Sequence, residues 1–296
     1  MKKYYLFLGT IFLLILLLGI INWVFLSAKP KREKILSRER VNFPTATPSI
    51  LSTPTSFSSP TPIALKENQT FAQDYGPCYW VPVLMYHHVM NPQKAKEIGA
   101  TNLNVPPAVF RLQIDYLINQ GYTVISLEEM VKALGNSSLP PKPLVLTFDD
   151  AYLDFYNQVY PLLKEKNLKA TVFVISQFVG GGQYLSWQQL REMVNSGLVM
   201  VGNHTLNHLY LTQLLTPEIR NQIVSAKNIL EENIGRKVEF FAYPYGKSTP
   251  EAKEILKEAG FKGAFLTTNG TPQCLAKPYG FSRIRIGATS LSHYGL

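Results

Sequence analysis

Short apolar runs rich in β-branched residues alternate with helical patterns from about residue 78 to the end of this 296-residue chain. Each run has the length of a strand, and the stretch after it has the spacing of a helix. Strands and helices in regular alternation favour parallel β/α units and therefore the α/β class. Seven or eight strands in about 220 residues are too many for a small open sheet and approach the size of a (β/α) barrel.

The two kinds of element are predicted at the following positions. Strands are expected at residues 81–86, 122–126, 144–148, 170–175, 199–203, 238–243, 263–267 and 281–286. Helices are expected at residues 107–119, 127–134, 153–165, 186–195, 217–234 and 250–259.

Residues 4–28 are nearly all apolar and carry no charge, which is long enough to cross a bilayer at about 20 residues per span. A cleavable signal peptide is the alternative, although its apolar region normally has about 7–15 residues. Lysines and arginines after the span favour a cytoplasmic body by the positive-inside rule. The very short N-terminal tail and the stalk-like segment that follows favour export, so we predict a single-pass membrane protein with an extracytoplasmic body.

Three parts are therefore expected along the chain. Residues 1–28 form a transmembrane anchor or signal segment, residues 29–76 form a Pro/Ser/Thr-rich disordered linker, and residues 77–296 form the folded domain. This last part holds 20 Lys or Arg against 16 Asp or Glu, so a nucleic-acid partner is not indicated. Cys78 and Cys274 lie near its two ends and are either a disulfide or two buried thiols. Nothing in the sequence predicts an oligomeric state.

Two clusters of metal-binding residue types follow predicted strands. Asp149 and Asp150 come directly after the strand at 144–148, while His204 and His208 follow the strand at 199–203. In (β/α) barrels the reactive groups lie at the carboxyl ends of the strands. One carboxylate and two imidazoles can bind a divalent ion and leave a position open for water, and the second aspartate is then free for proton transfer.

Each cluster also has a purely structural interpretation. An Asp-Asp pair after a strand can cap the next helix, and a His-x-x-x-His pair is often a pair on a helix surface. His87 and His88, after the first strand, can be a structural histidine beside an exposed one, and the Tyr-Pro-Tyr-Gly stretch at 243–246 can be an ordinary turn. The metal interpretation is favoured because all four features fall at strand ends of one domain.

In their order, these motifs resemble those of the polysaccharide deacetylases of the NodB-homology type, carbohydrate esterase family 4. They are Tyr-His-His-Val at 86–89, Leu-Thr-Phe-Asp-Asp at 146–150, Gly-Asn-His-Thr-Leu-Asn-His at 202–208 and Phe-Ala-Tyr-Pro-Tyr-Gly at 241–246. The resemblance covers residues 80–290 and is nearest to the group that deacetylates poly-β-1,6-N-acetylglucosamine. It implies a distorted (β/α) barrel of about seven strands.

The resemblance also implies a role for each aspartate and histidine of the motifs. Asp150, His204 and His208 become the ligands of a divalent metal, usually Zn²⁺, although the same donors accept Co²⁺, Ni²⁺ or Fe²⁺. Asp149 becomes the general base for a water whose pKa the metal lowers to about 7.

The proton donor and the oxyanion donor are assigned in the same way. Most of the family takes its acid from a late Leu-x-His motif, which His293 superficially matches. In the Tyr-His group the acid comes from the first strand, which here makes it His87, and we prefer His87. By analogy the backbone N–H of Tyr245 donates to the oxyanion.

One departure from the family pattern predicts a further residue. The third motif of the family often carries an arginine that holds the base, but this chain has Ala242 at that place. A carboxylate without a partner at a partly buried site would have a raised pKa, so another cation is expected beside Asp149. Arg283 and Arg285, on one face of the last predicted strand, are the candidates, and we prefer Arg283.

The resulting functional hypothesis is a metal-dependent hydrolase that removes N-acetyl groups from N-acetylglucosamine-containing polysaccharide at the cell surface. An O-acetyl polysaccharide esterase with the same site is an alternative, as is an inactive anchored glycan-binding protein. Of the aromatic residues considered for sugar stacking, which are Tyr152, Tyr184, Trp187 and Tyr245, only Tyr245 is retained as a prediction.

Overall fold

The computed structural model describes residues 77–136 and 138–296. The predicted membrane segment at 1–28 and the predicted linker at 29–76 lie outside the described residues, so both stay predictions. Within the two described ranges, no helix has the length and apolar character needed to span a membrane.

Seven parallel strands form the central sheet, in the spatial order β10-β2-β4-β5-β6-β7-β8. They are β2 (Val83–Tyr86), β4 (Pro143–Phe148), β5 (Ala170–Val174), β6 (Val199–Asn203), β7 (Phe240–Ala242), β8 (Gly263–Phe265) and β10 (Ile284–Arg285). The short β3 (Thr123–Val124) lies off this path and pairs with β4. Parallel strands covered on both faces are continuous apolar runs, and accordingly all six residues of β4 are buried.

The sheet curls because its two ends meet at the last segment of the chain. On one side β10 pairs with β2. On the other side Phe281 forms a parallel bridge with Phe265 of β8, and the Phe281 N–H donates to the Ala264 carbonyl oxygen at 2.9 Å. Residues 281–286 therefore lie between β8 and β2, which agrees with the predicted distorted barrel of about seven strands.

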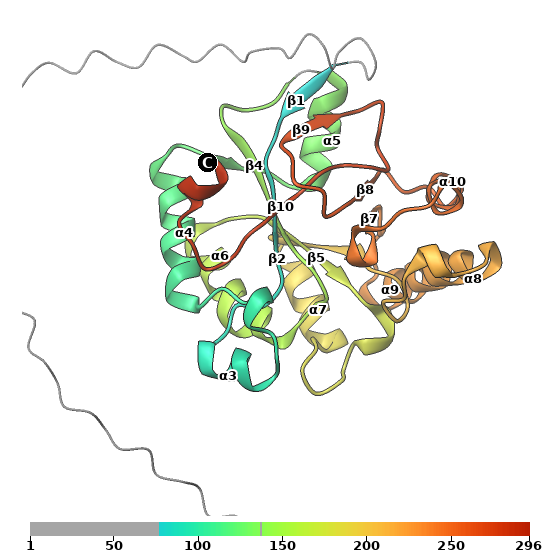
Figure 1. Cartoon of the computed structure of the whole chain (residues 1–296), viewed down its shortest axis with the longest axis horizontal. Coiled ribbons are helices and arrows are strands. Elements are labelled where there is room, and N and C mark those ends of the chain that lie inside the picture. Colours follow the sequence, from blue (N-terminus) through green and yellow to red (C-terminus); the bar gives the residue numbers. More distant parts are fainter. Residues whose placement is uncertain (1–76, 137) are drawn as a thin grey trace, which may run out of the picture. The chain divides into compact units, whose positions relative to one another are not determined.

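Helices connect the strands and lie around the outside of the sheet (Figure 1). They are α3 (Pro92–Glu97), α4 (Pro107–Asn119), α5 (Leu127–Asn136), α6 (Tyr160–Lys166), α7 (Trp187–Asn195), α8 (Thr216–Arg220), α9 (Ala226–Ile234) and α10 (Pro250–Glu258). Local signals begin several of them: Ser186 and Gln189 form a capping box at α7, and α4 and α10 begin with a proline.

Two of the predicted helices contain a π-helical turn. The turn η2 (Phe155–Val159) precedes α6, and the turn η5 (Asn221–Ser225) joins α8 to α9. Helices are present at the predicted ranges 153–165 and 217–234, and each contains a π-turn that the prediction did not include. A π-turn adds one residue to a helical turn and is held by tertiary contacts, which periodicity in the sequence does not report.

A second, two-stranded antiparallel sheet pairs β1 (Cys78–Trp80) with β9 (Pro272–Cys274). Cys78 and Cys274 are partners in its register and form a disulfide, which decides between the two alternatives for these cysteines. Beside the disulfide, the buried Gln273 amide donates to the carbonyl oxygens of Val81 and Ser282 at 3.1 and 3.0 Å. This small sheet ties the beginning of the described domain to the segment that leads into β10.

Candidate metal centre and active site

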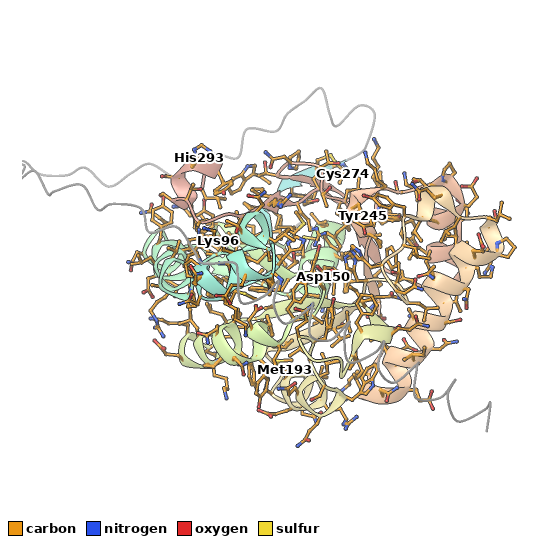
Figure 2. The ribbon with its side chains drawn as sticks, turned by 60° about the horizontal axis from the view of Figure 1, so that its bottom comes forward. Lys96, Asp150, Met193, Tyr245, Cys274 and His293 are labelled. Carbon is orange, nitrogen blue, oxygen red and sulfur yellow. A yellow bond between two sulfur atoms is a disulfide. The ribbon has the colours of Figure 1, made fainter. Side chains whose placement is uncertain are left out.

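The loops after β4, β6 and β7 bring most of the predicted site residues to one edge of the sheet, with Asp150 near the middle of the view in Figure 2. This is the carboxyl-terminal edge, where barrels place their reactive groups. The chain turns sharply there, because five non-glycine residues of these loops have left-handed backbone with φ between 57° and 71°. Such conformations cost about 1–3 kcal/mol each, so surrounding contacts must hold the loops. The five residues are Asp150, Ala151, Thr205, His208 and Tyr245.

Asp150, His204 and His208 place their ligand atoms in one compact group. Asp150 Oδ1 lies 3.5 Å from His204 Nε2 and 3.6 Å from His208 Nε2, and the two Nε2 atoms are 3.2 Å apart. Within the part of the chain that the structure describes, Asp150 Oδ1 is buried and has no hydrogen-bond partner. Buried polar atoms are nearly always hydrogen-bonded, and a bound ion is one of the few explanations for an exception.

The protonation of the two imidazoles suits metal binding. His204 Nδ1 lies 2.7 Å from the Ala242 carbonyl oxygen, so the ring proton belongs on Nδ1 and the lone pair on Nε2. Burial lowers the pKa of His204 to about 3 and also lowers the pKa of His208. Both rings are therefore neutral near pH 7, as metal ligands must be.

The carboxylate of Asp150 also suits metal binding. Burial, followed by the negative charge of Asp149, raises the pKa of Asp150 to about 7. A divalent cation beside Asp150 would offset both effects, because an opposite charge favours the ionised carboxylate. One carboxylate oxygen and two imidazole nitrogens make a donor set that binds zinc and leaves a coordination position open. The residues therefore fit a divalent metal.

Asp149 is held by the predicted arginine, Arg283. Its Nη1 donates to Oδ1 at 2.6 Å and its Nη2 to Oδ2 at 2.8 Å, so the pair is bidentate and charge-assisted. Both side chains are buried, at 0% and 3% exposure. Burial alone would raise the pKa of Asp149, but the charge of Arg283 and its hydrogen bonds hold that pKa well below its ordinary value. The other candidate, Arg285, instead donates to the Asn102 carbonyl oxygen.

Arg283 is itself fixed on its other sides. Its Nε donates to the Leu266 carbonyl oxygen at 3.0 Å, and its Nη1 also donates to Thr147 Oγ1 at 3.3 Å. The guanidinium carbon lies 5.4 Å from the centre of the Phe173 ring. That ring needs a glycine at position 202, because a Cβ on Gly202 would lie 2.4 Å from it. Packing in the barrel interior therefore fixes the position of the Arg283 side chain.

The two adjacent histidines after β2 have different surroundings. His88 is 3% exposed, and its Nδ1 lies 2.6 Å from Asp154 Oδ2, while Asp154 Oδ1 accepts from the Val89 N–H. This one of the pair has a structural role. Burial lowers the pKa of His87 to about 4, although the charge of Asp149, which acts on the ring, opposes that shift. His87 is thus the histidine of the pair that interacts with Asp149.

His293, the other histidine considered as an acid, lies in the short turn η7 (Leu291–Tyr294) and is exposed. Figure 2 shows it at the margin of the domain, well apart from Asp150. This placement agrees with the preference for His87.

The aromatic residues considered for sugar stacking divide into two groups. Tyr152 and Tyr184 stack on each other with ring centres 5.2 Å apart, and Trp187 packs against the hydrophobic core at the start of α7. Tyr245 is 45% exposed and stacks on Tyr210, a residue that the sequence did not single out. Tyr210 and Tyr245 are the more exposed of the two pairs, since Tyr152 and Tyr184 are half-buried.

Gln222 is a supporting residue that sequence reasoning missed. Its Oε1 accepts from the backbone N–H groups of Leu206 and Asn207 at 3.2 and 3.4 Å. It lies in the π-turn η5, whose Ile223 carbonyl oxygen also accepts from Asn203 Nδ2 at 2.9 Å. Both contacts hold the loop that carries the two imidazoles. A glutamine within a helical pattern was the only signal, and it does not indicate this partner.

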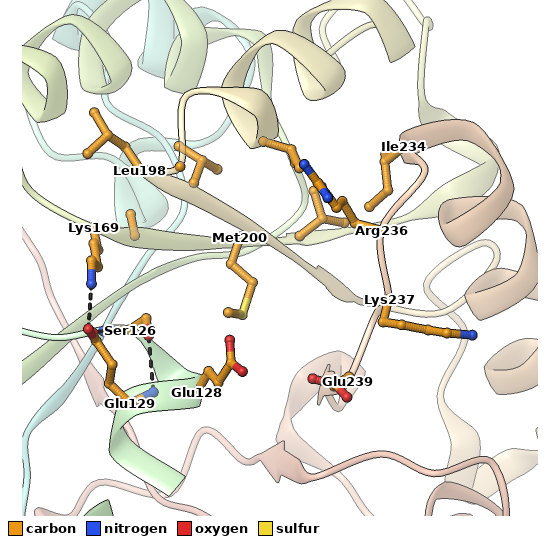
Figure 3. A pocket seen from close by; sticks show the side chains of 15 residues that line it. Ser126, Glu128, Glu129, Lys169, Leu198, Met200, Ile234, Arg236, Lys237 and Glu239 are labelled. Atoms are coloured by element: carbon orange, nitrogen blue, oxygen red, sulfur yellow. Dashed lines mark hydrogen bonds and ion pairs between the residues drawn. The ribbon is translucent and has the colours of Figure 1, made fainter. Parts of the chain in front are cut away.

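A separate hollow of about 430 Å³ lies at the opposite, amino-terminal edge of the sheet, beside the starts of β5 and β6 (Figure 3). Charged side chains of both signs line it, and some neutralise one another, as Lys169 Nζ does at 2.5 Å from Glu129 Oε1. None of the predicted site residues contributes to its walls. It is therefore not part of the candidate site.

Comparison with known proteins identifies the class of this site. The family model described as polysaccharide deacetylase matches residues 136–264. The solved structure of the Streptococcus pyogenes deacetylase PplD in complex with acetate is 32% identical, covers 72% of this chain and 94% of its own, and has a TM-score of 0.66. The chain belongs to the polysaccharide deacetylase family. The predicted resemblance and the predicted enzyme class are thereby confirmed.

Two further relatives of this deacetylase are informative. The solved structure of IcaB from Ammonifex degensii is 30% identical over 73% of this chain and 94% of that chain, with a TM-score of 0.64. The poly-β-1,6-N-acetyl-D-glucosamine N-deacetylase of Staphylococcus aureus is 25% identical over 248 residues, which are 79% of this chain and 84% of that protein.

Replacing Gln222 by methionine should weaken metal binding by the deacetylase. The change removes the acceptor of two loop N–H groups, and supporting contacts of metal ligands are typically worth about 10–100-fold in affinity. Competition with a chelator of known affinity would measure the Kd for Zn²⁺. Gln120→Met, at an exposed position, is the control and should leave the Kd unchanged. Equal Kd values for Gln222→Met and wild type would contradict the role of this residue.

Proposed function

We propose that this deacetylase is a metal-dependent hydrolase that removes N-acetyl groups from N-acetylglucosamine-containing polysaccharide at the cell surface. One observation carries the proposal: the buried Asp150 Oδ1 has no hydrogen-bond partner among residues 77–136 and 138–296, faces two neutral imidazoles and is next in sequence to an ionised Asp149. The name of the S. aureus relative supports the choice of sugar.

Asp150, His204 and His208 would hold the divalent ion, which we propose to be zinc. When bound, such an ion supplies Lewis-acid polarisation of the amide carbonyl and acidifies water to a pKa of about 7. Cobalt, nickel and iron suit the same donors, so availability would decide among them.

Asp149 acts as the general base in this proposal. Arg283 keeps the carboxylate ionised at neutral pH and fixes both of its oxygen atoms. A carboxylate that is ionised and fixed in this way can take a proton from the attacking water. Thr147 and Phe173 support the arginine, so the orientation of the base depends on packing within the barrel.

His87 is the proposed general acid that protonates the leaving amine. Its pKa of about 4, lowered by burial, leaves the ring neutral before the reaction, so the ring must first take up a proton from solvent and then give it to the amine nitrogen as the carbon–nitrogen bond breaks. The negative charge that develops on the amide oxygen would raise this pKa, because a nearby opposite charge favours the protonated imidazole. We propose that the backbone N–H of Tyr245 donates a hydrogen bond to that oxygen. Tyr245 has a left-handed backbone conformation with φ 57°.

The proposed architecture is a membrane anchor at 1–28, a linker at 29–76 and a catalytic domain at 77–296. The domain would face the outside of the cell, attached through a single span of the cell membrane. The Cys78–Cys274 disulfide supports an extracytoplasmic position, because disulfides persist in oxidising compartments and are rare in the cytosol.

Acetate release from defined N-acetylglucosamine oligomers tests this function. The purified protein should release acetate, stop after chelation and recover on addition of Zn²⁺. Asp149→Asn and Asp150→Asn should be inactive, whereas Asp115→Asn, at a surface carboxylate paired with Lys166, should match wild type.

Three results would contradict the proposal in different ways. Release that a chelator does not affect would exclude the metal. Release from O-acetyl esters alone would favour the esterase alternative. Glycan binding without any release would favour an inactive binding protein.

Replacing Arg283 by methionine should lower kcat and shift its pH dependence. Without the guanidinium the pKa of Asp149 rises, so the acid limb of kcat/KM moves to higher pH, and kcat falls by about 100-fold if the base is misplaced. Metal content should remain normal. Arg285→Met is the matched control, because this exposed arginine of the same segment donates to the Asn102 carbonyl oxygen and not to Asp149. An unchanged kcat and pH profile, in a variant whose circular dichroism shows it to be folded, would contradict the role of Arg283.

A further inference from the structure

Two tyrosines form an exposed stack beside the candidate metal centre. Tyr210 lies in the loop after β6, and Tyr245 lies in the loop after β7. Their ring centres are 3.6 Å apart with an angle of 7° between the planes. The Tyr245 ring centre is also 4.6 Å from that of the proposed metal ligand His208. The stack therefore continues directly from the metal ligands.

The exposure of this stack is unusual for tyrosines that only support a fold. Tyr243, two residues before Tyr245, is fully buried and donates its hydroxyl to the Tyr279 carbonyl oxygen at 3.1 Å. Tyr210 and Tyr245 instead leave 39% and 45% of their surface exposed. Leu209, next to Tyr210, is 43% exposed as well. Exposed apolar surface that adjoins a catalytic centre is typical of a binding site.

We propose that Tyr210 and Tyr245 form a subsite for a pyranose ring next to the sugar that loses its acetyl group. This inference rests on the proposed function and adds that the enzyme recognises several linked sugars. A pyranose has an apolar C–H face and a polar rim, and an exposed tyrosine offers an apolar ring with a polar hydroxyl at its edge. Tyr210 is thus a specificity-determining residue for chain length, although it touches none of the reacting atoms.

The binding energy of the Tyr210–Tyr245 stack should favour long substrates over short ones. Binding energy from a sugar that does not react can position the acetamido group at the metal, so a substrate without that sugar loses rate. A single aromatic stack is worth enough for about a tenfold effect. This benefit exists only for substrates that reach the stack.

The test compares wild type, Tyr210→Ala and Tyr210→Phe on β-1,6-linked N-acetylglucosamine oligomers from one to six sugars. For Tyr210→Ala we expect kcat/KM to fall about tenfold on the long oligomers and to be unchanged on the shortest substrate that reacts. Tyr210→Phe keeps the ring and should remain close to wild type. Metal content and Tm should be the same in all three. Leu112→Ala, which removes a 68% exposed leucine from α4, is the control for lost apolar surface.

An equal fall at every length, or none at any length, would overturn the subsite. Calorimetric titration with the hexamer of glucosamine, the expected product, measures binding independently of turnover. Tyr210→Ala should bind this hexamer about tenfold more weakly than wild type, and equal affinities would also overturn the subsite. If wild type releases no acetate but the hexamer binds in a Tyr210-dependent way, the proposed function fails while the subsite stands.

Discussion

The buried ion pair between Arg283 and Asp149 joins the chemistry of this deacetylase to the closure of its barrel. Arg283 belongs to the last segment, residues 281–286, which lies between β8 and β2, and Asp149 directly follows β4. Leaving either charge buried without the other would cost about 3–5 kcal/mol. Asp149 is therefore held in position only when residues 281–286 are packed between β8 and β2. Gln273 and the disulfide hold that end through the small β1–β9 sheet.

Two adjacent carboxylates acquire opposite properties from their surroundings. The pKa of Asp149 is held low by a fixed guanidinium, whereas burial and its neighbour raise the pKa of Asp150 to about 7. Groups of one chemical type whose pKa values are pushed apart commonly divide two roles between them. Here Asp149 pairs with Arg283, and Asp150 remains available to bind a cation.

Much of this organisation could be predicted from the sequence because it depends on local pattern. Strand β6 and helix α4 have the predicted bounds, since apolar runs and a proline at the first helical position are local signals. Arg283 could be predicted for a different reason. A buried carboxylate needs a counter-charge, and Ala242 at the motif position meant that the counter-charge had to come from elsewhere.

The features that were missed depend on contacts between distant parts of the chain. Strand β9 is three residues long and is defined by its pairing with β1, which has no periodic signature. Gln222 matters because a π-turn directs its side chain to backbone N–H groups some 15 residues earlier. The stack of Tyr210 on Tyr245 joins two loops that follow different strands. None of these pairings can be predicted from either sequence segment alone.

Crystal diffraction from the zinc-loaded protein, recorded at the zinc absorption edge, tests the central claim most directly. We expect one strong anomalous peak within about 2.0–2.2 Å of an Asp150 oxygen and of the Nε2 atoms of His204 and His208. Asp149 should remain paired with Arg283 beside that ion. An ion bound elsewhere, or a peak that Asp150 does not ligate, would show that Asp150, His204 and His208 are not the metal ligands.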